Sequence, residues 1–523
     1  MPPLPSSWTA QRKPFTGFLL IVSLIVLAAG AKTVLYDTLD PDCFWHLKVG
    51  EQLARDGVRP LHDSLSFASL REPWTPYSWL AELGMFHLWN FGGFRAAVLA
   101  TALLIAGTLI FVALGCREAI RASLDDGPAD AVLRGQRLFA TVLATAFAAF
   151  LSLAYLSFRP VTAAIFLLAV CAWLIFRDRR LGERSRAVWL VIPITALLVN
   201  IHLFAGLVPI WFGVLLIGAI SERFHAEDLI DNSELRRAWM RYAVLCGLSA
   251  LACTLTPMLP GLIATLRHYT VRDPMVASKV IGEMQPFWHG GMGKLSLALV
   301  LCFAVCLFRR HRRLRAGEML LLLVGTALLL WKGRCAPLFA LIAAPAFAVM
   351  LPELSDAILG RPLLRGAMAI VLLFGIGRTL TAFPTQTTQL GSWLNRNGPA
   401  TPGYPIDAAQ FVATQIHRDT GRLVNEFNWG GYLEWRLGDQ YQVLLDGRTQ
   451  VFSPRFWNDA YLGDNESRRQ FLSSVRADAA VVPAVKSHFK STLISLGWKT
   501  VHRDDRAEVL VPPGSALVGV DRD

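Results

Sequence analysis

Runs of apolar residues recur along most of this chain, and they restrict its possible folds more than any other feature. In a bilayer, a helix of roughly 20 apolar residues spans the hydrocarbon core and satisfies its own backbone hydrogen bonds. We therefore expect about eleven transmembrane helices, with soft boundaries because several runs are shorter than that length. The runs cover residues 15–31, 94–116, 138–158, 161–176, 187–201, 204–220, 242–263, 295–308, 319–331, 337–350 and 367–383.

The composition supports a polytopic membrane protein rather than a soluble enzyme. Of the 523 residues, 54% are hydrophobic and only 17% are charged, and the mean hydropathy is +0.42. Most of the eight cysteines lie inside predicted spans, where they act as small apolar residues. The chain has no cysteine after residue 383, so no disulfide framework supports the tail.

Arginine clusters alternate between the predicted loops and set the expected orientation. Short cytoplasmic loops carry an excess of lysine and arginine, so the clustered loops and the N-terminus should be cytoplasmic. The first outer loop, about residues 32–93, and the tail are then periplasmic, with the spans in the inner membrane of a bacterial cell. This topology explains part of the +12 net charge without a nucleic-acid partner. The clusters cover residues 117–137, 177–186, 223–241 and 309–315.

The chain divides into a membrane domain over residues 1–383, a linker over 384–405 and a small α/β domain over 406–523. The linker is rich in Thr, Gly, Pro and Asn, which is typical of an irregular segment. In the tail, helical and strand patterns alternate, which predicts a partly parallel sheet. The expected helices cover 408–417 and 431–436, and the expected strands 422–427, 442–445, 477–482 and 509–511.

Just after the first span, Asp40-Pro41-Asp42 and His46 place ionisable groups at the mouth of the bundle. Such groups are costly at membrane depth and suggest a functional site. The same triplet is also a good helix start, with Asp as N-cap, Pro at the first position and Asp near the positive end of the dipole. Both interpretations stay open, and they can apply to different aspartates. His46 shares a helix face with Asp42 and could orient it, bind a metal, or be an ordinary interfacial histidine.

Further motifs run along nearly all of the chain. With them, the chain resembles a large, poorly characterised group of bacterial polytopic membrane proteins related to the GT-C glycosyltransferase superfamily. The resemblance implies a GT-C-like fold of about eleven spans, with an acidic first outer loop and an outer C-terminal domain. The motifs are Asp40-Pro41-Asp42-x-x-Trp45-His46-Leu47-x-x-Gly50, Arg59-Pro60-x-x-Asp63-x-x-Ser66-Phe67, Pro73-Trp74-x-x-x-x-Trp79-Leu80-Ala81-Glu82, Arg159-Pro160, Asn200-Ile201-His202, Glu283-x-Gln285-Pro286, Arg334-x-x-Pro337-Leu338-Phe339-Ala340, Trp429-Gly430-Gly431-Tyr432-Leu433 and Asp446-Gly447-Arg448.

The resemblance implies a hexosyltransferase-like enzyme that moves a sugar from a polyprenyl-phosphate donor to a glycan, lipid or protein acceptor. A carboxylate would act as general base, and cations would stabilise the phosphate leaving group. The candidate bases are Asp40 and Asp42, supported by Asp37, His46, Asp63, Glu82, His202 and Glu283. The candidate phosphate ligands are Arg159, Lys332, Arg334 and Arg378, and a divalent Mg²⁺ or Mn²⁺ could bind Asp40, Asp42 and His46.

Alternative interpretations remain for these residues. The arginines could extend to ordinary lipid headgroups, and Trp429 to Tyr432 and Asp446 to Arg448 are expected to be structural turns with a buried ion pair. The whole chain could be a non-catalytic protein that binds or transports a polyprenyl lipid or glycan. A transporter would need polar residues through the depth of the bundle, and the spans contain few. A nucleotide-sugar donor is disfavoured because the chain has no glycine-rich phosphate loop.

Overall fold

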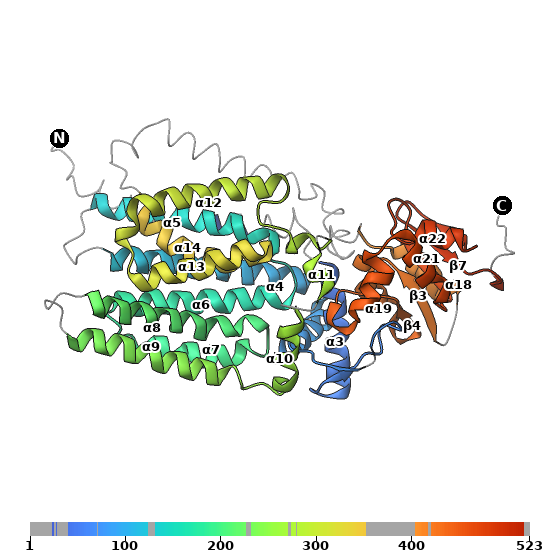
Figure 1. Ribbon diagram of the computed structural model, residues 1–523, viewed down its shortest axis with the longest axis horizontal. Helices are drawn as coiled ribbons and strands as arrows, with labels where there is room; N and C mark the ends of the chain where they lie inside the picture. Colours follow the sequence, from blue (N-terminus) through green and yellow to red (C-terminus); the bar gives the residue numbers. More distant parts are fainter. Residues whose placement is uncertain are drawn as a thin grey trace, which may run out of the picture.

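A bundle of long helices lies beside a small domain built on a β-sheet in this computed structural model (Figure 1). The structure describes residues 24, 25, 28, 40–70, 72–123, 131–225, 232–269, 273–278, 280–351, 403–416 and 420–516. The predicted span 367–383, most of the span 15–31, and the candidate residues Asp37 and Arg378 lie outside these ranges, as does most of the predicted linker.

The described helices make this a multi-pass membrane protein. Six of them are long and apolar enough to span a bilayer, rather than the eleven expected for the whole chain, and two expected spans are shorter apolar helices over Arg186–Leu198 and Ala316–Trp331. The helices of the bundle are α4 Trp79–Ala122, α5 Ala131–Ser152, α6 Pro160–Arg180, α7 Val191–Leu198, α8 Leu207–His225, α9 Asn232–Ala252, α10 Leu259–Arg267, α12 Gly290–Arg310, α13 Ala316–Trp331 and α14 Ala336–Met350, with the short α11 at Pro274–Ala277. The run expected as one span over 242–263 is divided between α9 and α10.

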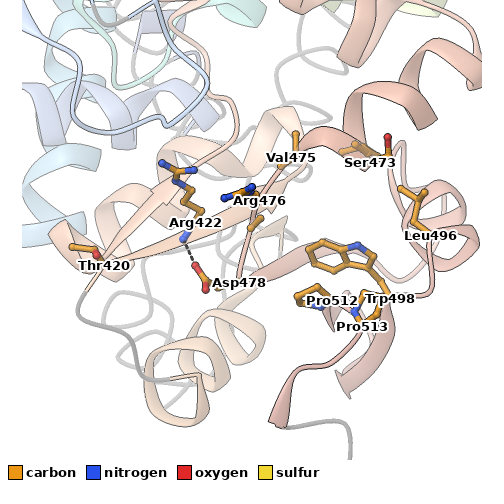
Figure 2. A pocket seen from close by; sticks show the side chains of 12 residues that line it. Thr420, Arg422, Ser473, Val475, Arg476, Asp478, Leu496, Trp498, Pro512 and Pro513 are labelled. Atoms are coloured by element: carbon orange, nitrogen blue, oxygen red, sulfur yellow. Dashed lines mark hydrogen bonds between the residues drawn. The ribbon is translucent and has the colours of Figure 1, made fainter.

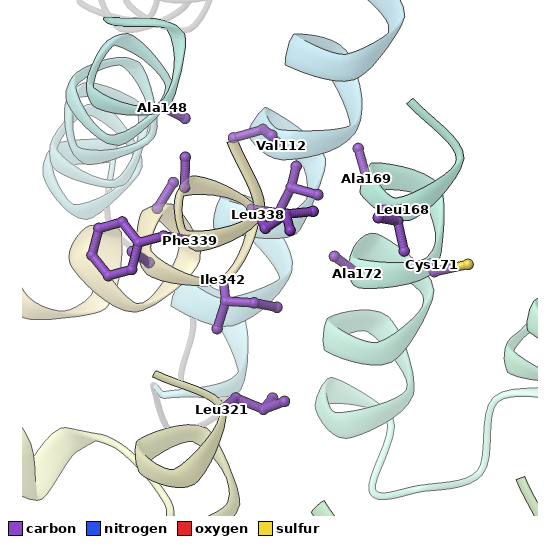
Figure 3. Packing of buried hydrophobic residues seen from close by; sticks show 14 of the residues in the cluster. Val112, Ala148, Leu168, Ala169, Cys171, Ala172, Leu321, Leu338, Phe339 and Ile342 are labelled. Atoms are coloured by element: carbon purple, nitrogen blue, oxygen red, sulfur yellow. The ribbon is translucent and has the colours of Figure 1, made fainter. Parts of the chain in front are cut away.

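Helix α14 is the central helix of the bundle. Its alanines let α4, α5, α6 and α13 approach closely, which matters in lipid because packing, rather than water exclusion, holds transmembrane helices together. Figure 3 shows Leu338 and Ile342 of α14 among side chains of the surrounding helices, including Val112 of α4 and Leu168 of α6. The membrane part therefore has a well-packed core that can hold the ends of its helices in fixed positions.

The predicted first outer loop contains ordered structure. Helix α3, Pro41–Asp56, is followed by a small antiparallel pair of strands, β1 Leu61–His62 and β2 Pro73–Trp74. Helix α4 then begins at Trp79 and bends at Gly93, whose φ of 55° lies in the left-handed region that glycine tolerates. The bend separates a first segment of α4, which packs on α3, from the segment that is long enough to span the membrane.

The tail folds around a mixed sheet of five strands in the order β4-β3-β5-β7-β6. As the sequence predicts, the sheet is partly parallel: β3 is parallel to β4 and β5, whereas β7 is antiparallel to β5 and β6. The strands are β3 Gly421–Asn425, β4 Tyr441–Val443, β5 Ala479–Pro483, β6 Lys499–Arg503 and β7 Ala507–Val511, and the helices are α18 Ile406–Gln415, α19 Gly430–Leu437, α20 Pro454–Phe456, α21 Asn465–Ser474 and α22 Lys490–Ser495. Strand β6, with mostly polar residues, was not predicted.

Alternate residues of each strand pack against different helices. Leu423 packs with residues of α18 and α19, whereas Val424 packs with residues of α21 and α22 on the other face. The first loop extends the sheet at its β4 edge, because the N–H of Val443 donates to the carbonyl of Leu65 at 2.9 Å and the N–H of Phe67 donates to that of Val443 at 3.1 Å. The first loop and the tail are therefore joined in one folded unit.

The arginine-rich ends of the helices meet at one end of the bundle. Helix α6 runs from Arg159, its N-cap near the sheet domain, to Arg180 at the opposite end of the bundle (Figure 1). Ion pairs near the C-terminal end of α6 join Arg179 to Glu318, Arg241 to Asp178 and Arg315 to Glu183. This arrangement is the one that the orientation rule requires, with the sheet domain on the side away from the arginine clusters. The orientation itself stays a prediction.

Candidate active site

A cavity of about 330 Å³ lies where the bundle meets the sheet domain. Its residues come from both parts of the chain and divide into a polar group and an apolar group. The polar group includes Asp42, His46, Tyr77, Arg159, His202, Tyr269, Glu283, Lys332, Arg334 and Thr449, and the apolar group includes Val161, Leu203, Leu207, Ile210, Leu266, Leu328, Trp331 and Leu338. A concave site with apolar walls and a few convergent polar groups is the usual form of a ligand site.

Asp40, Pro41 and Asp42 begin helix α3, as the sequence predicts. Asp40 is the N-cap, and its Oδ1 accepts a hydrogen bond from the backbone N–H of Asp42 at 2.9 Å. Pro41 is the first helical residue. A backbone N–H at that position has no acceptor within the helix, so proline, which lacks the N–H, loses no hydrogen bond there. Among the described residues, Asp42 lines the cavity and Asp40 does not. The structure thus gives the two aspartates, which the sequence leaves equivalent, different positions.

Arg159 lies between three carboxylates. Its side chain is only 12% exposed; one terminal nitrogen is 3.0 Å from Asp40 Oδ2 and 3.3 Å from Glu283 Oε2, and the other is 2.7 Å from Asp42 Oδ2. Burial lowers the pKa of Arg159, but the three carboxylates outweigh burial and place that pKa well above its ordinary value. The guanidinium expected to bind a lipid phosphate is therefore directed at protein carboxylates.

Asp42 has an environment that suits proton transfer. Burial raises the pKa of this carboxyl group, Arg159 opposes the rise, and Asp40 and Glu283 add to it, which places the pKa at about 6. The side chain remains 23% exposed, so a molecule in the cavity can reach it. A carboxylate with a pKa close to the working pH is a more effective general base than an ordinary aspartate.

Glu283, Arg334 and Lys332 form a second charged group on the cavity wall. Arg334 is 3.5 Å from Glu283 and 24% exposed, and the ammonium of Lys332 donates to the carbonyl of Val276. Burial raises the pKa of Glu283, but the charges of Arg334 and Arg159 outweigh it and place the pKa at about 2. Glu283 is therefore ionised, and it joins the two arginines in one network.

His46 and Glu82, both predicted as supporting residues, are brought together. Nδ1 of His46 and Oε1 of Glu82 are 2.9 Å apart, in a hydrogen bond between buried side chains. Burial, with a further effect from Arg159, lowers the pKa of His46 well below its ordinary value, so the imidazole is neutral. His46 lines the cavity next to Asp42 but hydrogen-bonds to Glu82 on helix α4. His202, another predicted supporting residue, also lines the cavity, and its Nδ1 accepts the N–H of Phe204 at 3.2 Å.

The predicted metal ligands are not gathered around one point. The described residues contain no group of three or more His, Cys, Asp or Glu residues that could hold a metal ion. Asp40 and Asp42 both contact Arg159, a cation that already lies between them, and His46 binds Glu82 instead. The described arrangement therefore does not fit a metal at these three residues, and metal dependence stays a prediction.

Asp63 lies away from the cavity, in a buried ion network with the tail. Arg448 is fully buried; it is 2.7 Å from Asp63, 3.4 Å from Glu434 and 2.5 Å from Asp446, and its guanidinium lies over the ring of Trp74 at 5.4 Å. The buried ion pair expected within Asp446-Gly447-Arg448 is thus present. Asp63 joins the first loop to the sheet domain instead of supporting the candidate base.

The tail supplies part of the cavity wall, which sequence analysis missed. A Cβ atom on Gly447 would lie 2.1 Å from Oδ1 of Asp42 and 2.7 Å from Nε1 of Trp45, so a larger residue there would displace the side chain of Asp42 or Trp45. Thr449 and Phe427 also line the cavity. The glycine of the Asp-Gly-Arg motif was the available signal, although nothing in the sequence indicates which segment approaches it.

Buried Asn425 fixes the segment that carries Gly447. Its Oδ1 accepts the N–H of Leu444 at 2.9 Å, and its Nδ2 donates to the carbonyl of Leu445 at 2.8 Å. These hydrogen bonds hold the backbone immediately before Asp446 and Gly447 against the end of β3.

Comparison with solved structures shows how this architecture is used elsewhere. Over 90% of this chain and 70% of the other, the fold matches an archaeal oligosaccharyltransferase, AglB from Archaeoglobus fulgidus, in complex with an inhibitory peptide and a dolichol-phosphate, with a TM-score of 0.51 and 13% identity. This chain has a GT-C fold. ArnT from Cupriavidus metallidurans, bound to undecaprenyl phosphate, is also similar, with a TM-score of 0.47 and 12% identity over 96% of this chain and 99% of that chain. No family model and no curated protein matches the sequence.

The GT-C fold agrees with the fold class expected from the sequence motifs. At 13% identity, the match to the archaeal enzyme concerns the fold and not the activity. The roles of the residues around the cavity must therefore be argued from their own positions.

Proposed function

We propose that this protein is a membrane glycosyltransferase that moves a sugar from a polyprenyl-phosphate-linked donor to an envelope acceptor. The observation that carries the proposal is the shared cavity, in which a carboxylate, Asp42, lies with two cations, Arg334 and Lys332, and with apolar residues of the helices. Apolar walls suit a polyprenyl chain and the cations suit its phosphate. The GT-C fold supports the proposal, because an archaeal enzyme with this fold was solved with a dolichol-phosphate.

In the proposed reaction, Asp42 accepts the proton of an acceptor hydroxyl as that oxygen bonds to the anomeric carbon of the sugar. The bond between the anomeric carbon and the phosphate oxygen breaks, and its electron pair leaves with the polyprenyl phosphate. Arg334 and Lys332 stabilise the negative charge that gathers on the phosphate. Arg159 holds Asp42 in place and keeps part of its population ionised.

The same geometry supports a proposal for the location. The cavity lies at the end of the bundle that carries the sheet domain, away from the arginine clusters. We place this end on the periplasmic side of the inner membrane, with the N-terminus in the cytoplasm. The donor sugar would then be used on the outer face of that membrane.

Two asparagine variants test the catalytic role. Asp42→Asn should lose on the order of 10²-fold or more in transfer, because an amide cannot accept the proton. Asp40→Asn should lose less, because asparagine caps a helix about as well as aspartate and Asp42 remains. Membranes that carry each variant at matched expression are assayed by mass spectrometry for polyprenyl phosphate released from the lipid-linked sugar.

The comparison between the two variants decides the proposal. Wild-type turnover in Asp42→Asn, with normal insertion and expression, would overturn the catalytic role. Full activity in the Asp40→Asn, Asp42→Asn double variant would show that neither aspartate is the base, whereas absence of transfer by the wild type would favour a protein that binds a polyprenyl lipid or glycan without chemistry.

A further inference from the structure

A second crevice lies beside the candidate active site, at the carboxyl ends of β3 and β5. Its volume is about 460 Å³, and it is lined by the loop after β3, the loop after β5 and Tyr461. Phe427, in the loop after β3, lines both this crevice and the main cavity. Phe427 therefore borders both spaces.

The topology of the sheet explains why a crevice forms there. From β3 the chain passes through α19 to β4 on one side, and then through α20 and α21 to β5 on the other side of β3. Helix α19, which follows β3, packs on one face of the sheet, and α22, which follows β5, packs on the other. The loops after β3 and β5 consequently leave in opposite directions, which is the arrangement at which open α/β sheets bind ligands.

Hydrogen bonds within the protein hold the walls of the crevice in place. Buried Glu426, at the end of β3, accepts hydrogen bonds through Oε1 from the hydroxyl of Ser487 at 2.6 Å and from the backbone N–H groups of His488 at 2.5 Å and Phe489 at 3.3 Å. The ring of His488 stacks on Tyr461 with centroids 4.2 Å apart. One carboxylate thus joins the two loops, and the walls of the crevice are held without a ligand.

The side chains that remain on the rim are polar. Lys486 and Asn428 are exposed, and Lys486 has a φ of 59°, a left-handed conformation that is unfavourable for a residue with a side chain. Together they offer an ammonium and an amide beside the rings of Phe427 and Tyr461. Hydrogen-bonding groups next to aromatic faces match the alternating hydroxyl groups and C–H faces of a sugar.

We propose that this crevice binds a hydroxyl-rich carbohydrate as the acceptor, with its reacting hydroxyl reaching past Phe427 towards Asp42. The inference rests on the proposed function and adds the acceptor class and its site. A peptide acceptor is the competing outcome of the test.

A larger pocket at the opposite end of the same sheet supplies a matched control (Figure 2). It has a volume of about 580 Å³ and lies at the amino ends of β3 and β5, where Asp478 accepts the backbone N–H of Arg422 at 2.9 Å. It shares no lining residue with the main cavity within the described structure. Arg476 on its rim is exposed, like Lys486, so removal of either charge changes the same property at opposite ends of the sheet.

The test measures saccharide binding to the purified full chain by saturation-transfer NMR, with chitotetraose, cellotetraose and maltotetraose as probes and a tetrapeptide as the competing class. At least one tetrasaccharide should bind to the wild type and to Arg476→Ala. Lys486→Asn, which keeps a residue that tolerates positive φ, and Asn428→Ala should each weaken that binding about 10-fold. Retention of undecaprenyl phosphate in native mass spectra should be unchanged in both.

Each outcome separates this proposal from the proposed function. Saccharide binding that survives in Asp42→Asn but is lost in Lys486→Asn supports the crevice even if no transfer is found. Binding of the peptide alone, absence of saccharide binding to the wild type, or equal affinity in the Lys486 and Arg476 variants would overturn the crevice as the acceptor site. Transfer could depend on Asp42 while Lys486→Asn and Asn428→Ala leave the KM for the acceptor unchanged. That result would exclude the crevice as the acceptor site and leave the proposed function intact.

Discussion

At the scale of single residues, Arg159 decides the electrostatics of the site. It is the shared partner of Asp40, Asp42 and Glu283, so its removal would leave three carboxylates close together. Glu283 also contacts Arg334, which couples the candidate base to the phosphate end of the cavity. A change at any one of these residues should therefore alter the proton affinity of Asp42.

The pH dependence of transfer should reveal this coupling. Asp42 acts in its ionised form, whose fraction rises as pH passes through its pKa of about 6, so kcat/KM should fall about 10-fold per pH unit well below that value and level off above it. Glu283→Gln removes a charge that raises the pKa of Asp42, so the acidic limb should move to lower pH. Arg159→Gln removes a charge that lowers this pKa, so the limb should move to higher pH.

A distant charge gives the control for these shifts. Arg455 is exposed and pairs only with nearby Asp459 among the described residues, so Arg455→Gln should leave the pH profile unchanged. Shifts of the same sign in Glu283→Gln and Arg159→Gln would contradict the assignment of Asp42 as the titrating base.

At the scale of structural elements, the carboxyl edge of the sheet forms a wall of the site. The loops after β3 and β4 line the main cavity, and those after β3 and β5 line the neighbouring crevice. Helix α19 packs on α3, where a Cβ on Gly431 would lie 2.9 Å from the backbone nitrogen of Trp45. This contact between two helices sets the distance between the sheet domain and Asp42.

Gly447→Ala should disturb this contact. The added methyl group would overlap Asp42 and Trp45, and such overpacking costs about 1–3 kcal/mol. We expect a lower Tm and at least about a 10-fold loss of transfer, because small displacements of a reacting group have large effects. Gly403→Ala, whose Cβ meets no atom within 4 Å, is the control and should change neither Tm nor transfer. A Gly447→Ala protein as stable and active as the wild type would show that the tail does not position Asp42.

The elements that the sequence predicts best are those defined by local patterns. The start of α3 at Asp40 follows from capping chemistry, and strands β3 and β5 follow from short apolar runs. Prediction was poorer where tertiary context decides, as in polar β6 or in the break between α9 and α10. Between α3 and α4 the sequence predicts only a loop. The ordered structure there is stabilised by contacts with β4, which the local sequence does not reveal.

At the scale of the whole molecule, the fold class could be predicted from hydropathy and motifs, whereas the site could not. The apolar runs place Asp42 near the membrane, but its contacts come from Arg159 at the start of α6, which also pairs with Glu283, and from a tail segment at Gly447. Such contacts join residues far apart in sequence and leave no periodic pattern.

The orientation of the molecule can be tested with reporters at its two ends. Alkaline phosphatase, which is active only outside the cytoplasm, should be active when fused after Pro405 and inactive when fused after Gly182 in an arginine-rich loop. A fluorescent protein that matures only in the cytoplasm should give the opposite result. The reverse pattern at both positions would invert the orientation and place the cavity on the cytoplasmic side.

The close approach of Gly447 to Asp42 also has a consequence for the order of events during synthesis. Asp42 leaves the ribosome with the first part of the chain, whereas Gly447 follows after the described helices of the bundle have been made. The cavity wall is therefore absent while the bundle inserts, and a nascent chain lacks the complete site until its tail has folded against α3. If the proposed function holds, only fully translated and correctly inserted molecules carry out transfer.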